Sequence, residues 1–196
     1  MQKLISEIKK CTFCEPHLDL GAKPIVSFTE NSKILLISQA PGRIAHEKNL
    51  AWDDASGKVL RKWLNISFDD FYNPDNFAIL PLGFCYPGKG KTGDKPPRKE
   101  CAPLWQHKVM QNFKNVKLKI LIGGYSQNYY LPKFKKQNLT NKVQNYQQFL
   151  PEFFVLPHPS PRNRFWMQKN PWFEKGVIPE LQERVASIIK TENSNI

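Results

Sequence analysis

Continuous runs of apolar side chains recur along the chain, separated by longer segments of mixed polarity. The runs cover residues 33–37, 77–82, 118–122 and 152–156. A strand buried on both faces of a parallel sheet needs such a run, whereas a strand with one face in water alternates polar and apolar positions. Glycine, proline or a polar residue follows each run and ends it. The pattern therefore predicts four buried, parallel strands.

The segments between these runs show apolar positions at helical spacing. In residues 56–64 the apolar side chains fall at positions 59, 60, 63 and 64, and Ser56 suits the N-cap. Strands that alternate with helices indicate an α/β fold with a parallel sheet. No repeat or linker divides the chain, so we expect a single domain over residues 1–196, of which 191–196 form a frayed tail. Further helices are expected over residues 2–10, 99–113, 140–149 and 174–190, and from about residue 125.

Three segments of unusual composition follow the predicted strands. Residues 38–42 read SQAPG, residues 86–97 form a basic loop rich in glycine and proline, and residues 158–163 read HPSPRN. The prolines of the last segment fix φ and remove backbone donors, so we expect a stiff loop there, anchored by packing of the aromatic residues in 165–173. Because open α/β sheets bind ligands at the carboxyl ends of their strands, these loops should meet in one crevice.

The chain is strongly basic. It has 29 lysine and arginine residues against 17 acidic ones, a formal net charge of +12. Such a charge on a folded domain favours a polyanionic partner, nucleic acid first, with a membrane surface and the ribosome as alternatives. No apolar run approaches the ~20 residues that span a bilayer, and residues 1–10 do not resemble a secretory signal. We expect a soluble, cytoplasmic protein without a membrane partner, and a monomer by default.

The cysteines fall into two pairs. Cys11 and Cys14 form a CxxC, and Cys85 and Cys101 follow later in the chain. Disulfides are rare in the cytosol, and a CxxC brings two thiolates to one metal centre. The second pair completes a set of four ligands, which suits either tetrahedral zinc or a 4Fe–4S cluster. The alternative is that these cysteines are unrelated buried thiols.

Residues 52–57, WDDASG, place an aromatic side chain and two adjacent carboxylates at an expected helix start. Asp53 suits a helix cap, which the helix dipole favours. Asp54 is the better candidate to orient and activate a water, and Trp52 offers an indole face on which a base can stack. Trp52 can equally serve as core packing.

The HPSPRN loop carries a histidine, a hydroxyl and a basic tip. An isolated histidine is usually a surface or structural residue, but His158 follows a predicted strand in a loop held rigid by prolines. Ser160 can donate to a phosphate. At the tip, Arg162, Asn163 and Arg164 can enter a duplex or bind its backbone.

Together these motifs resemble the uracil-DNA glycosylase superfamily, most closely its iron–sulfur branches, families four and five. Members carry a Gly-Glu-Ala-Pro-Gly-like turn, here residues 38–42, and an aromatic before an Asp-Ala-Ser-Gly-like stretch, here Trp52 and residues 54–57. They also carry a His-Pro-Ser-Pro motif, here residues 158–161. The cysteine set resembles the cluster ligands of those branches. The resemblance covers roughly residues 8–190.

The resemblance implies a three-layer α/β/α sandwich around a four-stranded parallel sheet. It implies a DNA repair enzyme that flips uracil or another deaminated base out of single- or double-stranded DNA and hydrolyses its N-glycosidic bond, without cutting the strand. Asp54 would position the attacking water, and His158 would stabilise negative charge on the leaving base. Trp52 would stack on the base. The pocket would be lined by Gln39, Ala40, Pro41 and Gly42, DNA would be bound by Ser56, Ser160, Arg162, Asn163 and Arg164, and a structural 4Fe–4S cluster would be held by Cys11, Cys14, Cys85 and Cys101.

The sequence departs from the family pattern at three places. Gln39 replaces the glutamate of one branch, which moves the carboxylate role to Asp54, and a shorter gap after the aromatic keeps Asp53 as an alternative. Pro81 stands where the branches often place an asparagine that reads the base edge, so the preferred base is left open. Residues 86–97 hold more lysine and glycine than the family's Pro-Pro-Gly-Asn loop, and we expect them to contact the DNA backbone.

Two further hypotheses compete with a DNA glycosylase. One is a non-catalytic nucleic-acid-binding protein of the same fold that keeps a structural metal site but lacks the water-activating group. The other is a structural-zinc protein with an unrelated partner.

Overall fold

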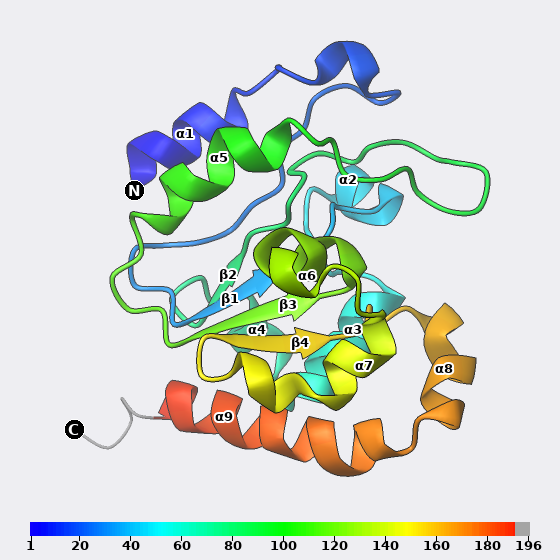
Figure 1. Cartoon of the computed structure of the whole chain (residues 1–196). Helices are drawn as coiled ribbons and strands as arrows, with labels where there is room; N and C mark the ends of the chain where they lie inside the picture. The colour runs from blue at the N-terminus through cyan, green and yellow to red at the C-terminus, as the bar shows by residue number, and fades with distance from the viewer. Residues whose placement is uncertain (191–196) are drawn as a thin grey trace.

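A parallel sheet organises the chain, as seen in a computed structural model that describes residues 1–190. The strands pair in the order β2-β1-β3-β4, and every pairing is parallel (Figure 1). The predicted four-stranded parallel sheet is therefore confirmed. The strands are β1 (Ile34–Ile37), β2 (Phe77–Ile79), β3 (Leu118–Ile122) and β4 (Phe153–Leu156).

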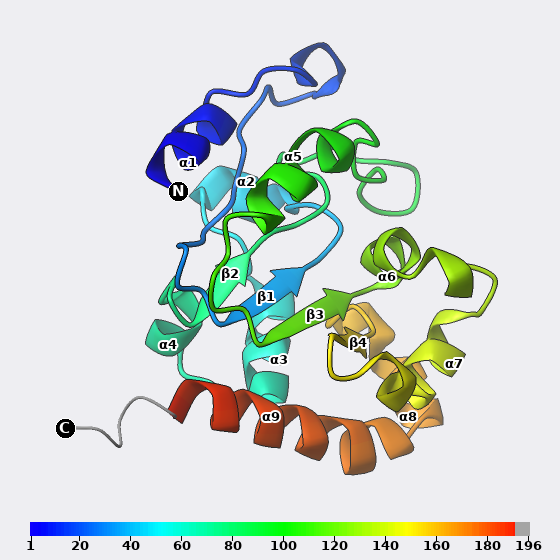
Figure 2. The same cartoon turned by 60° about the vertical axis from the view of Figure 1, so that its left-hand side comes forward.

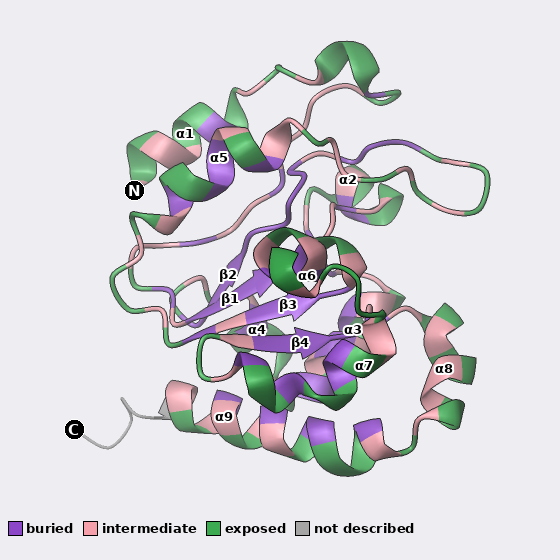
Figure 3. Ribbon diagram, viewed as in Figure 1, coloured by how far each residue is buried: buried purple, intermediate pink, exposed green. Residues whose placement is uncertain are grey.

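Burial explains why the apolar runs become strands. Every residue of β1 and β2 is buried, as are the last three residues of β3 and of β4 (Figure 3). Lys119 in β3 is an exception, and its ammonium pairs with Glu152 at 2.9 Å and lies 5.2 Å from the ring centre of Phe153. The sheet is thus a double-sided core element, as continuous apolar runs require.

Helices cover both faces of this sheet. Figures 1 and 2 show α5 and α6 on one face and α3 and α9 on the other, which gives the expected three layers, α/β/α. α3 packs along α9, and the ring of Trp63 meets that of Phe173 edge-on at 4.9 Å. The helices are α1 (Gln2–Lys9), α2 (Arg43–Lys48), α3 (Ala55–Leu64), α4 (Phe68–Tyr72), α5 (Cys101–Met110), α6 (Gly124–Tyr130), α7 (Leu139–Gln144), α8 (Arg164–Lys169) and α9 (Ile178–Lys190).

The helices differ from the sequence predictions where segments are short. The sequence pattern does not predict α2, α4 or α8, because five or six residues are too few to show a helical period. The helix expected over residues 140–149 breaks after α7 into a 3₁₀ turn, Tyr146–Phe149. The last helix opens with a wide π turn, Phe173–Val177, before α9 begins.

The second strand is shorter than the predicted residues 77–82. It ends at Ile79, and Pro81 does not interrupt the contact with β1, because the N–H groups of Leu80 and Leu82 are the ones that face β1. The backbone still follows β1 for a little longer, and the Leu82 N–H donates to the carbonyl of Ser38 at 2.9 Å. The segment beyond β2 therefore stays fixed against the loop that follows β1.

Two expectations concern the limits of the described chain. The expected tail, residues 191–196, lies outside the described residues, and a single domain stays a prediction. Within residues 1–190, no helix is both long enough and apolar enough to cross a bilayer.

The strand order fixes where a ligand site can form. From β1 the chain moves outward to β2, then crosses to β3 on the other side of β1 and continues to β4. The loops after β1 and β3 therefore leave in opposite directions, and the gap between them is the usual ligand site of such sheets. Gly123 follows β3, and His158 follows β4. A Cβ atom built on Gly123 would lie 3.7 Å from the Cβ atom of His158.

Candidate active site

A cavity of about 390 Å³ opens at the carboxyl edge of the sheet. We call it the crevice. Its volume falls in the range of small-ligand pockets. The predicted loops do meet there, and Asn163 and Arg164 are the predicted site residues of this edge that do not line it. The crevice is lined by Ser38, Gln39, Ala40, Pro41, Gly42, Ala45, Ala51, Trp52, Asp54, Ser56, Ile79, Pro81, Gly93, Asp94, His158, Ser160 and Arg162.

The SQAPG turn after β1 forms one wall. The carbonyl of Gln39 accepts a hydrogen bond from the Gly83 N–H at 2.8 Å, which ties the turn to the segment beyond β2. Gly42 is the N-cap of α2. Pro81 adds a buried, apolar surface to the crevice, and its carbonyl accepts from the buried amide of Gln106 on α5 at 2.7 Å. Because residue 81 is a proline, this position offers no side-chain amide that could read a base edge.

The second wall is a tight turn at residues 52–57. Trp52 adopts a left-handed backbone conformation, φ 65°, which is strained for a bulky residue, and only 8% of it is exposed. A Cβ atom on Gly57 would lie 1.6 Å from the carbonyl oxygen of Trp52. That carbonyl also accepts from Nη1 of Arg61 at 3.0 Å. Glycine is thus required at position 57 for the turn to close.

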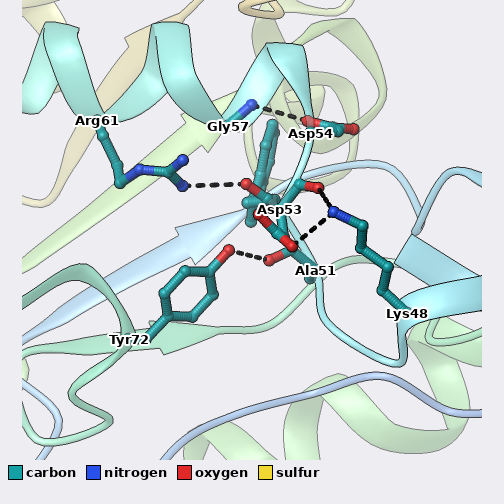
Figure 4. A network of polar contacts seen from close by, with 8 residues as sticks. Lys48, Ala51, Asp53, Asp54, Gly57, Arg61 and Tyr72 are labelled. Atoms are coloured by element: carbon teal, nitrogen blue, oxygen red, sulfur yellow. Dashed lines mark hydrogen bonds and ion pairs between the residues drawn. The ribbon is translucent and has the colours of Figure 1, made fainter. Parts of the chain in front are cut away.

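The two adjacent aspartates have different partners (Figure 4). Asp54 is the N-cap of α3, and its Oδ1 accepts from the Gly57 N–H at 2.8 Å. The prediction that Ser56 caps this helix is therefore wrong. Ser56 lies inside the first turn of α3 and lines the crevice. Asp53 pairs with the Lys48 ammonium at 2.8 Å, which lowers the pKa of Asp53. Asp54, not Asp53, is the aspartate of this pair that lines the crevice.

His158 stands across the crevice from this turn. Its ring centre lies 5.7 Å from that of Trp52, at an interplanar angle of 31°. Burial lowers the pKa of the imidazole below its ordinary value, although the carboxylates of Asp54 and Asp94 act in the opposite direction. The lowered pKa favours the neutral form of His158, and a neutral imidazole can still donate one N–H to a ligand.

Short hydrogen bonds brace the loop that carries His158. The amide of Asn163 donates to the carbonyl of His158 at 2.6 Å, so Asn163 is bound within the loop. Ser160 caps the following 3₁₀ turn by accepting from the Arg162 N–H at 3.3 Å. The side chains of Arg162 and Arg164 are exposed. Arg162 lines the crevice, whereas Arg164 begins α8.

The aromatic segment after the loop is packed only in part. The rings of Trp166, Trp172 and Phe173 form an edge-on cluster, as expected of an anchor. Phe165 is 73% exposed on α8, so the prediction that the whole segment packs is wrong for this residue. The sequence does not reveal this exposure. Phe165 stands among other aromatic residues that do pack, and only the position of α8 shows that its side chain faces solvent.

The basic loop after Cys85 folds back as a small hairpin beside the crevice. The Gly90 N–H donates to the carbonyl of Gly93 at 2.6 Å, and the Lys95 N–H donates to the carbonyl of Gly88 at 2.8 Å. Asp94 on this hairpin lines the crevice. Asp94 is exposed, and sequence reasoning missed it, because a long polar loop gives no signal of which side chain borders the crevice.

The predicted metal ligands share a second, smaller cavity of about 20 Å³, here called the cysteine cavity. Burial raises the pKa of Cys85 to about 11 and that of Cys101 to about 12. Within residues 1–190, no three metal-ligating side chains are arranged around a single ion position. The cavity is lined by Cys11, Cys14, Ala22, Pro24, Gly83, Phe84, Cys85, Arg98, Cys101 and Trp105.

The cysteine cavity also presents buried donors to any group that it holds. The Phe84 N–H donates to Sγ of Cys101 at 3.3 Å. Nε of Arg98 and Nε1 of Trp105 are buried without a hydrogen-bond partner among the described residues. Unpaired buried donors are costly, and the sulfur atoms of a thiolate-bound cluster would accept from them. Four thiols and two buried donors around one cavity are the kinds of group that hold an iron–sulfur cluster, although the thiols are not gathered around one ion position in this structure.

Comparison with known proteins identifies the family. A solution NMR structure of a protein from Methanosarcina acetivorans, described as a candidate uracil DNA glycosylase, has 14% sequence identity and a TM-score of 0.48. That match covers 80% of this chain and 95% of the other. The sequence model of the uracil DNA glycosylase superfamily matches residues 26–182, which include the whole sheet and every loop of the crevice. The chain therefore belongs to the uracil DNA glycosylase superfamily.

Proposed function

We propose that this protein is a DNA repair glycosylase that removes uracil or another deaminated base from DNA and leaves the strand uncut. One observation carries the proposal: a single crevice brings together an aromatic ring, a carboxylate and a neutral imidazole, contributed by Trp52, Asp54 and His158. A base inside a duplex cannot reach such a crevice, so the target nucleotide must be flipped out of the stack.

Base binding falls to the walls of the crevice. Trp52 offers its ring beside His158, and the turn formed by residues 39–42 lines the opposite side. The apolar wall at Pro81 gives no hydrogen bond from a side chain to the base edge. Position 81 therefore cannot set the base preference through a side-chain hydrogen bond, and a panel of damaged bases is the direct way to establish that preference.

The reaction is a hydrolysis at the sugar. The bond between C1′ and the base nitrogen breaks, and its electron pair leaves with the base. Asp54 orients a water whose oxygen forms the new bond to C1′, and its carboxylate takes the proton that the water loses. His158 donates its N–H to the leaving base as negative charge grows there, in the manner of an oxyanion hole. The products are the free base and an abasic site.

The DNA surface surrounds the mouth of the crevice. Arg162, Arg164 and Phe165 are exposed beside it and can contact the duplex around the vacated position. Ser56 and Ser160 line the mouth, where phosphates flanking the target nucleotide would lie. Asn163 serves this surface as a brace through its bond to His158. The net charge of +12 supports binding to a polyanion.

We also propose that Cys11, Cys14, Cys85 and Cys101 hold a 4Fe–4S cluster, with zinc as the alternative. A bound cluster would supply folding energy to the segments that it joins rather than a step of the hydrolysis. Absorption near about 400 nm together with iron and sulfide analysis tests this assignment. A colourless protein with stoichiometric zinc would contradict it.

The activity is tested with single-turnover assays on single- and double-stranded DNA carrying uracil, hypoxanthine, xanthine or mispaired thymine. Asp54→Asn separates the two roles of Asp54, because asparagine caps a helix as well as aspartate but cannot accept the proton of water. We expect a loss of roughly a hundredfold or more in rate with an unchanged melting temperature. Asp53→Asn is the matched control and should keep the rate.

The non-catalytic alternative predicts a different outcome. Wild-type protein that binds DNA but removes none of these bases would exclude the enzyme and leave a nucleic-acid-binding protein of the same fold. Equal rates for Asp54→Asn and wild type would exclude Asp54 as the water-activating group while leaving the activity in place.

A further inference from the structure

Asp94 brings a second carboxylate to the crevice, from a loop that carries none of the family-like motifs. Its side chain lines the same cavity as Trp52, Asp54 and His158. Its Oδ2 lies 3.5 Å from the position of a Cβ atom built on Gly42, so the carboxylate abuts the SQAPG turn. Its charge acts on His158 in the same direction as that of Asp54. The crevice that holds His158 is thus lined by two carboxylates rather than one.

The hairpin holds Asp94 in this place. Gly90 pairs with Gly93, and Lys95 with Gly88, so the backbone is fixed on both sides of the residue. The side chain accepts from the hydroxyl of Tyr86 at 3.3 Å. The buried Tyr86 lies at the base of the same loop.

Asp94 carries its charge without an ion pair among the described residues, although its loop is rich in lysine. Lys95, its neighbour in sequence, turns away and pairs with Asp19 at 3.0 Å. An unneutralised carboxylate that faces a DNA-binding mouth repels phosphates and weakens binding. The charge of Asp94 therefore does not favour contact with the DNA backbone.

We propose that Asp94 is a further catalytic group, which stabilises the positive charge that develops on the deoxyribose as the base leaves. This inference rests on the proposed glycosylase function. Hydrolysis of an N-glycosidic bond makes C1′ and the ring oxygen electron-poor, as in other glycoside hydrolyses with oxocarbenium-like transition states. Asp54 would act on the water and Asp94 on the sugar from the hairpin side. A carboxylate near the mouth is suited to the sugar, because the base enters the deeper part of the crevice.

A catalytic role for Asp94 predicts two effects of opposite sign, one on the excision rate and one on the affinity for DNA. A purely structural role does not predict this combination. Replacing Asp94 by asparagine removes charge while keeping an oxygen that accepts from Tyr86. The excision rate should fall, because the cationic sugar loses its partner. Affinity for DNA should stay the same or rise, because a charge that repels phosphates is gone.

The experiment compares Asp94→Asn with a control variant, Asp19→Asn, and with a variant that loosens the position of Asp94, Tyr86→Phe. It uses the substrate that wild type cleaves fastest. Single-turnover rates are measured with excess protein, and affinity is measured on the same DNA carrying a 2′-fluoro sugar that resists cleavage. We expect Asp94→Asn to lose roughly tenfold to a hundredfold in rate, a typical effect of one preorganised electrostatic group. Its affinity should be equal or up to a few-fold tighter. Asp19→Asn removes a charge from the same region outside the crevice and should leave the rate unchanged.

Tyr86→Phe tests how Asp94 is positioned. It removes the hydroxyl that holds Asp94 but keeps the ring and the charge of Asp94, so its rate should fall between those of wild type and Asp94→Asn. A rate for Asp94→Asn within twofold of wild type overturns the inference, as does a loss in Tyr86→Phe larger than that in Asp94→Asn. Should Asp94→Asn melt lower than wild type, Asp94→Ser replaces it under the same criteria. Wild type that removes no base from any substrate contradicts the proposed function itself, and the inference falls with it.

Discussion

The crevice and the cysteine cavity are built in contrasting ways. The crevice takes its side chains from loops at the ends of three strands, and close backbone contacts fix them. The cysteine cavity gathers segments before β1, beyond β2 and at the start of α5, and it leaves donors of Arg98 and Trp105 unpaired. Contacts within the protein therefore shape the crevice, whereas the cysteine cavity would be completed by the metal group that we propose for it.

The largest effect should come from the turn at residues 52–57. Gly57→Ala forces a Cβ atom into the backbone carbonyl of Trp52, which cannot move without opening the turn. We expect a loss of about 4 kcal/mol or more in the free energy of unfolding, a large part of the stability of a typical domain. Urea or thermal melts measure it. Gly176→Ala is the control, since its Cβ atom meets nothing within 4 Å, and a similar loss there would refute the steric explanation.

Removing the imidazole should affect the rate next most strongly. His158→Ala takes away the donor to the leaving base, and we expect a loss of about 10²–10³ in single-turnover rate. Burial lowers the pKa of His158, so its neutral form persists below the usual titration range. The wild-type rate should therefore stay level from about pH 8 to about pH 6.5 and change only in more acidic solution. A titration step centred near neutrality would contradict a neutral His158.

Phe165 allows a test at the rim of the crevice. The side chain is 73% exposed beside two exposed arginines, where it can stack on an unpaired base. Phe165→Ala should weaken DNA binding by about 1–3 kcal/mol. Fluorescence anisotropy with DNA carrying an abasic-site analogue measures it. The exposed Phe68 on α4 provides the control, and Phe68→Ala should bind DNA as wild type does.

The smallest effect should be at the cysteine cavity. Trp105→Phe keeps the packing and removes one of the unpaired donors. We expect iron to be released to a chelator about tenfold faster, as for other groups that support metal ligands. Trp166→Phe removes an indole N–H that is bonded to Thr140 instead, and it should leave iron release unchanged. Equal release from both variants would mean that Trp105 does not contact the bound group.

The sequence predicts the sheet well because strands buried on both faces leave continuous apolar runs. It also predicts most of the crevice, because loops after parallel strands must share an edge. It fails where several neighbouring residues fit one role: Ser56 and Asp53 both suit an N-cap by their type, but the structure gives the cap to Asp54, in the turn that Gly57 closes. It fails again at Asp94 and Phe165, whose direction depends on a hairpin and a short helix without a periodic signal.

One buried amide links the two cavities. Gln106 on α5 donates to the carbonyl of Pro81 in the crevice wall, and α5 begins at Cys101 in the cysteine cavity. Tyr130 of α6 in turn donates to Gln106 at 2.7 Å. Cys101 and Gln106 are about a turn and a half apart on α5. A displacement of Cys101 would therefore move Gln106 and, through its hydrogen bond, the crevice wall at Pro81. If the four cysteines hold the proposed cluster, loss of one of these ligands should therefore change which bases the protein accepts.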